Sequence, residues 1–233
     1  MYHPFSVAQT IVNAWKILKK NFAVIAVYTI VAFVISIVFG FLVKFILIDV
    51  ILDYMAAIIS TIGLSFIFLG FIKLIFQLID KEYYEFDFTD ILPKIKMLLS
   101  YIILLIIVST LAVFVTNAIR TMDDGMVKYL LGIFSGLIVE IFFLFYFPLC
   151  ACFIVDDDSG PFESVAQSFR LIKGNFWKYL ILFLFIEVLV LIASFTVIGL
   201  ILVVPFVNIL LVVAYRKLVY SHQDVDDDVS ETI

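Results

Sequence analysis

Charged residues, cysteine and histidine are scarce in this chain. Only 15% of its 233 residues are charged and 65% are hydrophobic, whereas soluble domains are about 25% charged. Cys150 and Cys152 lie in an apolar run and match no zinc or redox motif. His3 and His222 lie near the ends of the chain, so no metal and no cofactor is predicted. These shortages exclude an ordinary soluble fold, a disulfide scaffold and intrinsic disorder.

Basic surface and catalytic motifs are missing as well. The net charge is −5, so the strongly basic surface of a nucleic-acid-binding protein is absent and no nucleic-acid partner is expected. The sequence contains no serine-nucleophile elbow, no P-loop and no dinucleotide-binding fingerprint. We therefore predict that the chain is not an enzyme, although two carboxylates within the membrane can in principle do acid–base work.

Long apolar runs dominate the chain instead. A helix rises about 1.5 Å per residue, so about 20 apolar residues cross a hydrocarbon core of about 30 Å. Six runs reach that length, at 22–43, 54–79, 97–119, 129–155, 177–197 and 200–219. They are continuous rather than alternating, which argues against a β-barrel. We predict an all-α polytopic membrane helix bundle of six spans, a single unit over 1–220, with an acidic, disordered tail at 221–233.

Lys and Arg are distributed unevenly between the two sides of this predicted bundle. Twelve of the 15 fall on the side that holds both ends of the chain and three on the opposite side. Cytoplasmic loops carry such an excess. Trp15 and Trp177 fall at the same boundary, where interfacial aromatic residues collect. We therefore predict a multi-pass protein of the cell (plasma) membrane with both termini in the cytoplasm.

Short stretches of the sequence recur. Ser-Val-Ala-Gln occurs at 6–9 and at 164–167, and residues 14–22 align with 168–176 without a gap. A weaker copy begins near Phe88. We predict a parallel internal repeat of three units, at about 4–79, 87–155 and 161–220. Each unit consists of a short cytoplasmic helix followed by a transmembrane hairpin.

Two of these short helices are predicted to be amphipathic. Helical spacing gives one an apolar face of Phe5, Ala8, Val12, Trp15 and Leu18, and the other a face of Phe162, Val165, Ala166, Phe169, Ile172 and Phe176. Such helices lie in the membrane interface or pack on the end of the bundle, and the two arrangements are compatible. The residues predicted to face the lipid bilayer and its anionic phospholipid headgroups are Trp15, Lys19, Lys20, Arg170, Lys173 and Trp177.

The second of these segments carries a family resemblance. Residues 168–178, followed by an apolar run and by Val204-Pro205-Phe206, resemble a poorly characterised family of prokaryotic integral membrane proteins. That family includes the membrane domain fused to some glycerophosphoryl diester phosphodiesterases. The resemblance implies six spans and an unsettled function. These 233 residues contain no phosphodiesterase domain, so the resemblance does not imply that activity.

Two glutamates stand out within the predicted spans. Glu140 follows Lys128 by 12 residues and Glu187 follows Trp177 by 10, which places both about 15–18 Å into their spans. A charge at that depth costs about 3 kcal/mol on insertion scales. With Asn208 they form a candidate intramembrane polar site, and a proton or cation path is one interpretation. The other is a neutral acid hydrogen-bonded across helices.

Small residues mark predicted packing faces. Gly132 and Gly136 form a small-xxx-small pair in the fourth span. Ala56 and Ser60 form another in the second span, with Gly63 one turn further on. Such pairs allow helices to approach closely, and we expect them to be used within this chain.

Two functions of different kinds are compatible with these features. The first is a non-catalytic membrane protein that organises lipid, or a protein partner on the cytoplasmic side, through its amphipathic helices. The alternative is a transporter or channel with a path for protons or cations at Glu140 and Glu187. The two alternatives differ in whether the glutamates share a water-accessible cavity.

Overall fold

The computed structural model describes residues 5–45, 50–80 and 88–230, and every regular element among them is a helix. Six helical segments are long and apolar enough to cross a membrane, which confirms the predicted all-α polytopic bundle: Phe22–Phe41, Tyr54–Asp80, Thr89–Arg120, Met126–Asp156, Phe176–Ala193 and Gly199–Tyr220. The elements in chain order are α1 (Val7–Lys20), α2 (Phe22–Phe45), α3 (Val50–Asp80), η1 (Phe88–Ile91), α4 (Ile95–Arg120), α5 (Met126–Ile141), η2 (Phe142–Tyr146), α6 (Phe147–Asp156), α7 (Pro161–Lys173), α8 (Phe176–Ala193) and α9 (Val197–Ser230).

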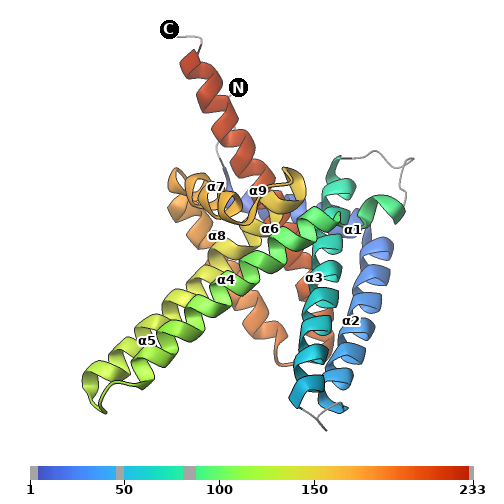
Figure 1. The fold of residues 1–233 in the computed structure, drawn as a ribbon. Helices are drawn as coiled ribbons and strands as arrows, with labels where there is room; N and C mark the ends of the chain where they lie inside the picture. Colours follow the sequence, from blue (N-terminus) through green and yellow to red (C-terminus); the bar gives the residue numbers. More distant parts are fainter. Residues whose placement is uncertain (1–4, 46–49, 81–87, 231–233) are drawn as a thin grey trace.

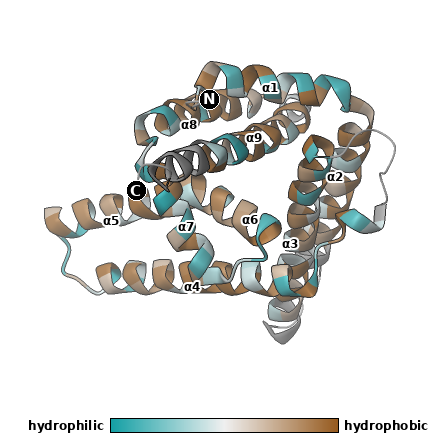
Figure 2. Cartoon of the chain, turned by 90° about the horizontal axis from the view of Figure 1, so that it is seen from above, coloured by the Kyte–Doolittle hydropathy of each residue, from teal (hydrophilic) through white to brown (hydrophobic). Residues whose placement is uncertain are grey.

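The spanning helices form three hairpins that converge at one end and diverge at the other (Figure 1). We call the converging end, which holds α1 and α7, the terminal end. The opposite end, where α4 meets α5 and α8 meets α9, is the loop end. The view from above shows α1 at one edge of the bundle, beside α8 and α9 and reaching toward α2 (Figure 2). The hairpin of α4 and α5 leans away from the hairpin of α2 and α3.

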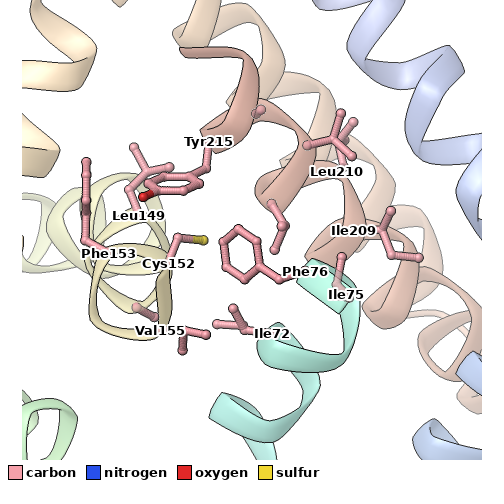
Figure 3. Close-up of a cluster of buried hydrophobic side chains, with 14 of the residues drawn as sticks. Ile72, Ile75, Phe76, Leu149, Cys152, Phe153, Val155, Ile209, Leu210 and Tyr215 are labelled. Atoms are coloured by element: carbon pink, nitrogen blue, oxygen red, sulfur yellow. The ribbon is translucent and has the colours of Figure 1, made fainter. Parts of the chain in front are cut away.

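The core lies at the terminal end, where the second helix of each hairpin meets the other two. Side chains from α3, α6 and α9 interlock there (Figure 3), among them Ile75 and Phe76, Leu149 and Phe153, and Ile209, Leu210 and Tyr215. Eight of the ten residues of α6 are buried, whereas none of the 16 residues of α5 is buried. The fourth span is therefore buried in its second half and largely exposed in its first.

A π-helical turn, η2, joins these two halves of the fourth span. Pro148 has no N–H to bond the carbonyl of Leu144, so the regular hydrogen-bond pattern cannot continue through it. The N–H of Phe147 bonds instead to the carbonyl of Phe142, five residues earlier. Such single-turn π segments occur often at functional sites. This one directly follows Glu140 and the end of α5.

Two expectations about the ends of units are corrected. The short helix expected near Phe88 is only a four-residue 3₁₀ turn, η1, which is too short to present an amphipathic face. The tail expected to be disordered from 221 continues α9 as a helix to Ser230. Extending an existing helix avoids the cost of nucleating a new one, so even an acidic segment can prolong it.

The two predicted packing faces differ in outcome. A Cβ on Gly63 would lie 2.5 Å from the ring of Phe39, so the glycine lets α2 approach α3 closely. Ala56 and Ser60, on the same helix, are buried. A Cβ on Gly132 or Gly136 would meet nothing within 4 Å. The expectation that this pair packs against another helix of the chain is therefore wrong.

Candidate functional site

A polar cluster closes the core at the terminal end and joins all three hairpins. The guanidinium of Arg216, on α9, pairs with Asp80 at the end of α3 and lies 3.3 Å from Oδ1 of Asp156 at the end of α6. The hydroxyl of Tyr215 donates to Oδ2 of Asp156 at 3.0 Å. The Arg216 guanidinium also stacks 4.8 Å from the centre of the Phe76 ring. One cation therefore links two carboxylates that come from different hairpins.

This cluster was not predicted from the sequence. Asp80, Asp156 and Arg216 each end an apolar run, and there they look like ordinary solvated charges. The side chain of Arg216 is only 20% exposed, and its Nε has no hydrogen-bond partner among the described residues.

The corner between α6 and α7 is held by side chains rather than being a loosely solvated turn. Asp158 adopts a left-handed backbone with φ of 53°, a conformation that aspartate tolerates better than most residues. Its carboxylate lies 2.7 Å from Nζ of Lys94. The buried hydroxyl of Ser159 donates to Gln167 at 2.9 Å. Partial desolvation, and then the charge of Asp156, raise the pKa of Asp157 above its ordinary value.

The helices α1 and α7 face the bundle with the same kind of stripe. The stripe consists of small residues at matching positions 154 residues apart: Thr10 matches Ser164, and Ala14 matches Ser168. All four are fully buried. One turn further, Leu18 and Ile172 are buried as well. Small side chains let these helices lie close against the bundle, because they keep the backbones near one another. Ser168 also donates to the sulfur of Cys150 on α6 at 3.3 Å.

The predicted apolar faces of α1 and α7 are divided between the bundle and the outer surface. Most of the large side chains assigned to them are exposed, with Val12 at 50%, Trp15 at 49%, Phe162 at 72% and Phe169 at 46%. The stripe that faces the bundle includes Leu18 and Ile172 of the predicted faces and otherwise consists of smaller residues. Each helix thus has one side on the bundle and a second apolar side that is largely exposed, although Phe169 touches Tyr146 of η2.

The residues predicted to face lipid are all exposed. Lys19, Lys20, Arg170 and Lys173 are exposed. Nζ of Lys19 lies 5.2 Å from the centre of the Trp15 ring, and that ring meets Phe206 of α9 edge-on at 5.8 Å. Trp177, at the start of α8, is 74% exposed.

The three residues of the predicted intramembrane site are placed separately. Glu140 is exposed on α5 and lines a hollow of about 620 Å³ between α4 and α5. Glu187 is half-buried on α8 and does not line that hollow, although it lies within reach of the Glu140 charge. The amide of Asn208 donates at 2.8 Å to the carbonyl of Val204 in its own helix. Asn208 thus satisfies its donor locally, and the structure does not bring the three residues into one site.

Comparison with known proteins yields no relative: the chain matches no family model, no curated protein and no solved structure. Among the described residues, no group of three or more His, Cys, Asp or Glu side chains is placed to hold a metal ion. The features that bear on function are therefore the surface of α1 and α7 and the polar groups within the spans.

Proposed function

We propose that this chain is a non-catalytic protein of the plasma membrane that binds anionic phospholipid headgroups through α1 and α7, with both termini in the cytoplasm. One observation carries the proposal. An exposed aromatic residue is followed one turn later by an exposed lysine in both helices, as Trp15 and Lys19 in α1 and as Phe169 and Lys173 in α7. The two pairs are 154 residues apart, which also supports the parallel repeat.

Such a surface suits the boundary between headgroups and hydrocarbon. Aromatic side chains favour that depth, and the lysine ammonium groups extend toward the phosphates. Each Lys or Arg near an anionic surface contributes about 1 kcal/mol. The buried stripes of Thr10 and Ala14 and of Ser164 and Ser168 hold the two helices against the bundle. Both surfaces are therefore presented at a fixed height on the terminal end, which supports a role in organising lipid around the bundle.

The two tryptophans allow a direct test on the intact protein. Trp177→Phe leaves Trp15 as the only tryptophan, and the chain is placed in vesicles that contain brominated phosphatidylglycerol or brominated phosphatidylcholine. We expect the brominated anionic lipid to quench Trp15 fluorescence more strongly than the neutral lipid does. A chain with Phe169→Trp, Trp15→Phe and Trp177→Phe tests α7 in the same way.

Charge variants separate headgroup binding from mere contact with the bilayer. Lys19→Gln with Lys20→Gln should remove the preference of Trp15 for the anionic lipid. The matched control, Arg120→Gln with Lys128→Gln, removes two charges at the loop end and should leave the preference intact. Equal quenching by both lipids, or a preference that survives the loss of Lys19 and Lys20, would overturn the proposal.

A further inference from the structure

The hairpin of α4 and α5 has two chemically different sides. The hollow of about 620 Å³ that Glu140 lines also has polar residues along its walls: Thr116, Arg120, Lys128, Tyr129 and Ser135. Two further hollows on the same hairpin, of about 340 Å³ and 400 Å³, are lined by apolar residues apart from Ser135. The apolar hollows suit lipid chains. The hollow at Glu140 also has a mainly apolar surface, but its polar residues offer hydrogen-bond partners to water, and we call it the polar hollow.

The polar hollow extends from the loop end to Glu140. Gly132, Gly136 and Glu140 are four residues apart, so they lie on one side of α5. No side chain fills the wall at either glycine, where a Cβ would have nothing within 4 Å. Lys128 lines the outer end, and Glu140 follows it by 12 residues, or about 18 Å along the helix. The carboxylate therefore stands at the inner end of a polar groove deep in the span.

We infer that this hollow is a water-filled half-channel through which the Glu140 carboxylate exchanges protons with the loop-end side of the membrane. Two cationic side chains stand at its mouth. Arg120 and Lys128 are cations and repel other cations there. Lys128 lies 2.8 Å from Asp124, and this hydrogen bond lowers the pKa of the Asp124 carboxyl. The charge of Arg120 remains without an ion-pair partner among the described residues.

Proton uptake at Glu140 has a consequence for the next span. The charged groups around Glu140 are Arg120 of α4 and Lys128 of its own helix, which line the other end of the hollow, and Glu187 of α8, which does not line it. When Glu140 takes a proton from water in the hollow, the repulsion that its charge exerts on Glu187 is removed. The π turn that follows Glu140 lies between this groove and the packed core. The inference does not depend on lipid binding by α1 and α7.

Cysteine accessibility tests the half-channel. In a chain with Cys150→Ala and Cys152→Ala, Glu140→Cys is exposed to a membrane-impermeant, negatively charged methanethiosulfonate from the loop-end side. The matched control is Ile138→Cys, since Ile138 is on the same helix, is 61% exposed and lines both apolar hollows. We expect modification at 140 to be at least tenfold faster than at 138. Adding Gly136→Leu, which fills the groove, should slow modification at 140 toward the rate at 138.

Three results would overturn the inference. They are equal rates at 140 and 138, reaction at 140 only from the terminal side, and a rate at 140 that Gly136→Leu leaves unchanged. Infrared spectroscopy of the chain with its native cysteines is a second test, in case the cysteine variants do not fold. A carboxyl band should respond to a pH change on the loop-end side and vanish in Glu140→Gln. A band that is unchanged in Glu140→Gln, or no responsive band, would also refute it.

Discussion

The two halves of the fourth span differ more than any other neighbouring segments of the molecule. In α6, side chains from three hairpins cover almost every residue, whereas α5 contacts mainly α4 and buries nothing. Both halves are equally apolar in sequence, and both belong to one continuous membrane-crossing segment. Hydrophobicity therefore takes a helix into the membrane, but it does not decide whether protein or lipid covers it.

Shape and paired charge decide that question. Within a bilayer, lipid chains are as apolar as leucine, so helices associate through close packing and polar contacts. The terminal end has both, in the interlocked rings of Phe76, Phe153 and Tyr215 and in the pairs made by Arg216. At the loop end, two glycines and a glutamate of α5 border the hollow beside α4, and no described side chain packs closely on the glycines.

Matched truncations in α6 and α5 test the contrast between the two halves of the fourth span, and they have the largest expected effect on stability. Leu149→Ala removes a fully buried side chain, and such a cavity costs about 2–5 kcal/mol. Leu131→Ala removes the same atoms at a position that is 42% exposed, where lipid or detergent fills the space. We expect a large loss for the first variant and almost none for the second in the free energy of unfolding, measured by SDS titration in mild detergent. Equal losses would refute the division of the span.

Arg216→Ala tests the polar cluster. Removing one partner of a fully buried ion pair costs about 3–5 kcal/mol and an exposed pair contributes at most about 1 kcal/mol. Because the Arg216 side chain is 20% exposed and that of Asp80 is 45% exposed, we expect a loss of about 2 kcal/mol in the same titration. Arg170→Ala is the control, since Arg170 is exposed on α7 and should cost less than about 0.5 kcal/mol. A loss no larger than that of the control would show that the cluster does not hold the hairpins together.

Leucine substitutions at glycines compare two packing faces. Gly63→Leu forces a side chain against Phe39, and overpacking of this kind costs about 1–3 kcal/mol. We expect the lower part of that range, because the half-buried Phe39 ring can turn aside. Gly136→Leu points into open space and should not lower the free energy of unfolding. Destabilisation by Gly136→Leu as large as that by Gly63→Leu would indicate that a helix does cover α5.

Asp157→Asn has the smallest expected effect, and that effect depends on pH. The pKa of Asp157 is raised in the folded protein, which means that folding disfavours the charged carboxylate. The free-energy cost of this charge to the folded state grows as the pH rises above the ordinary pKa of 3.8. Asparagine should therefore raise the unfolding free energy near neutral pH by about 0.5 kcal/mol or less, since solvent screens an exposed group. The gain should disappear below pH 3.8, where the carboxyl is protonated in both states. A gain that persists there would have a cause other than charge.

The sequence was sufficient to predict the six spans, because continuous apolar runs of this length are typical of membrane-crossing helices. It also predicted that α1 and α7 are helices. It did not predict which side of each helix faces the bundle. Large apolar residues such as Trp15 and Phe169 have the same spacing whether protein or membrane covers them, and the buried stripe of Thr10, Ala14 and Ser168 has no hydrophobic signature.

The polar groups show the same limit. Glu140 and Glu187 were identifiable from depth alone, but depth did not predict that only Glu140 lines the hollow between α4 and α5. Asp80 and Arg216 are 136 residues apart, and no local pattern indicates that they pair. The Gly132 and Gly136 pair led to a wrong expectation, since a small-xxx-small pattern describes a surface that permits close approach without specifying that a helix occupies it.

The place of Arg216 in the last span has a consequence for biosynthesis. Synthesis proceeds from the N-terminus, so the hairpins that carry Asp80 and Asp156 leave the ribosome before α9 does. Until Arg216 arrives, two carboxylates at the ends of α3 and α6 face a gap without their cation, and the shared core cannot close. We expect chains truncated before α9 to be captured by membrane quality control, and full-length chains to assemble only after the third hairpin has been inserted.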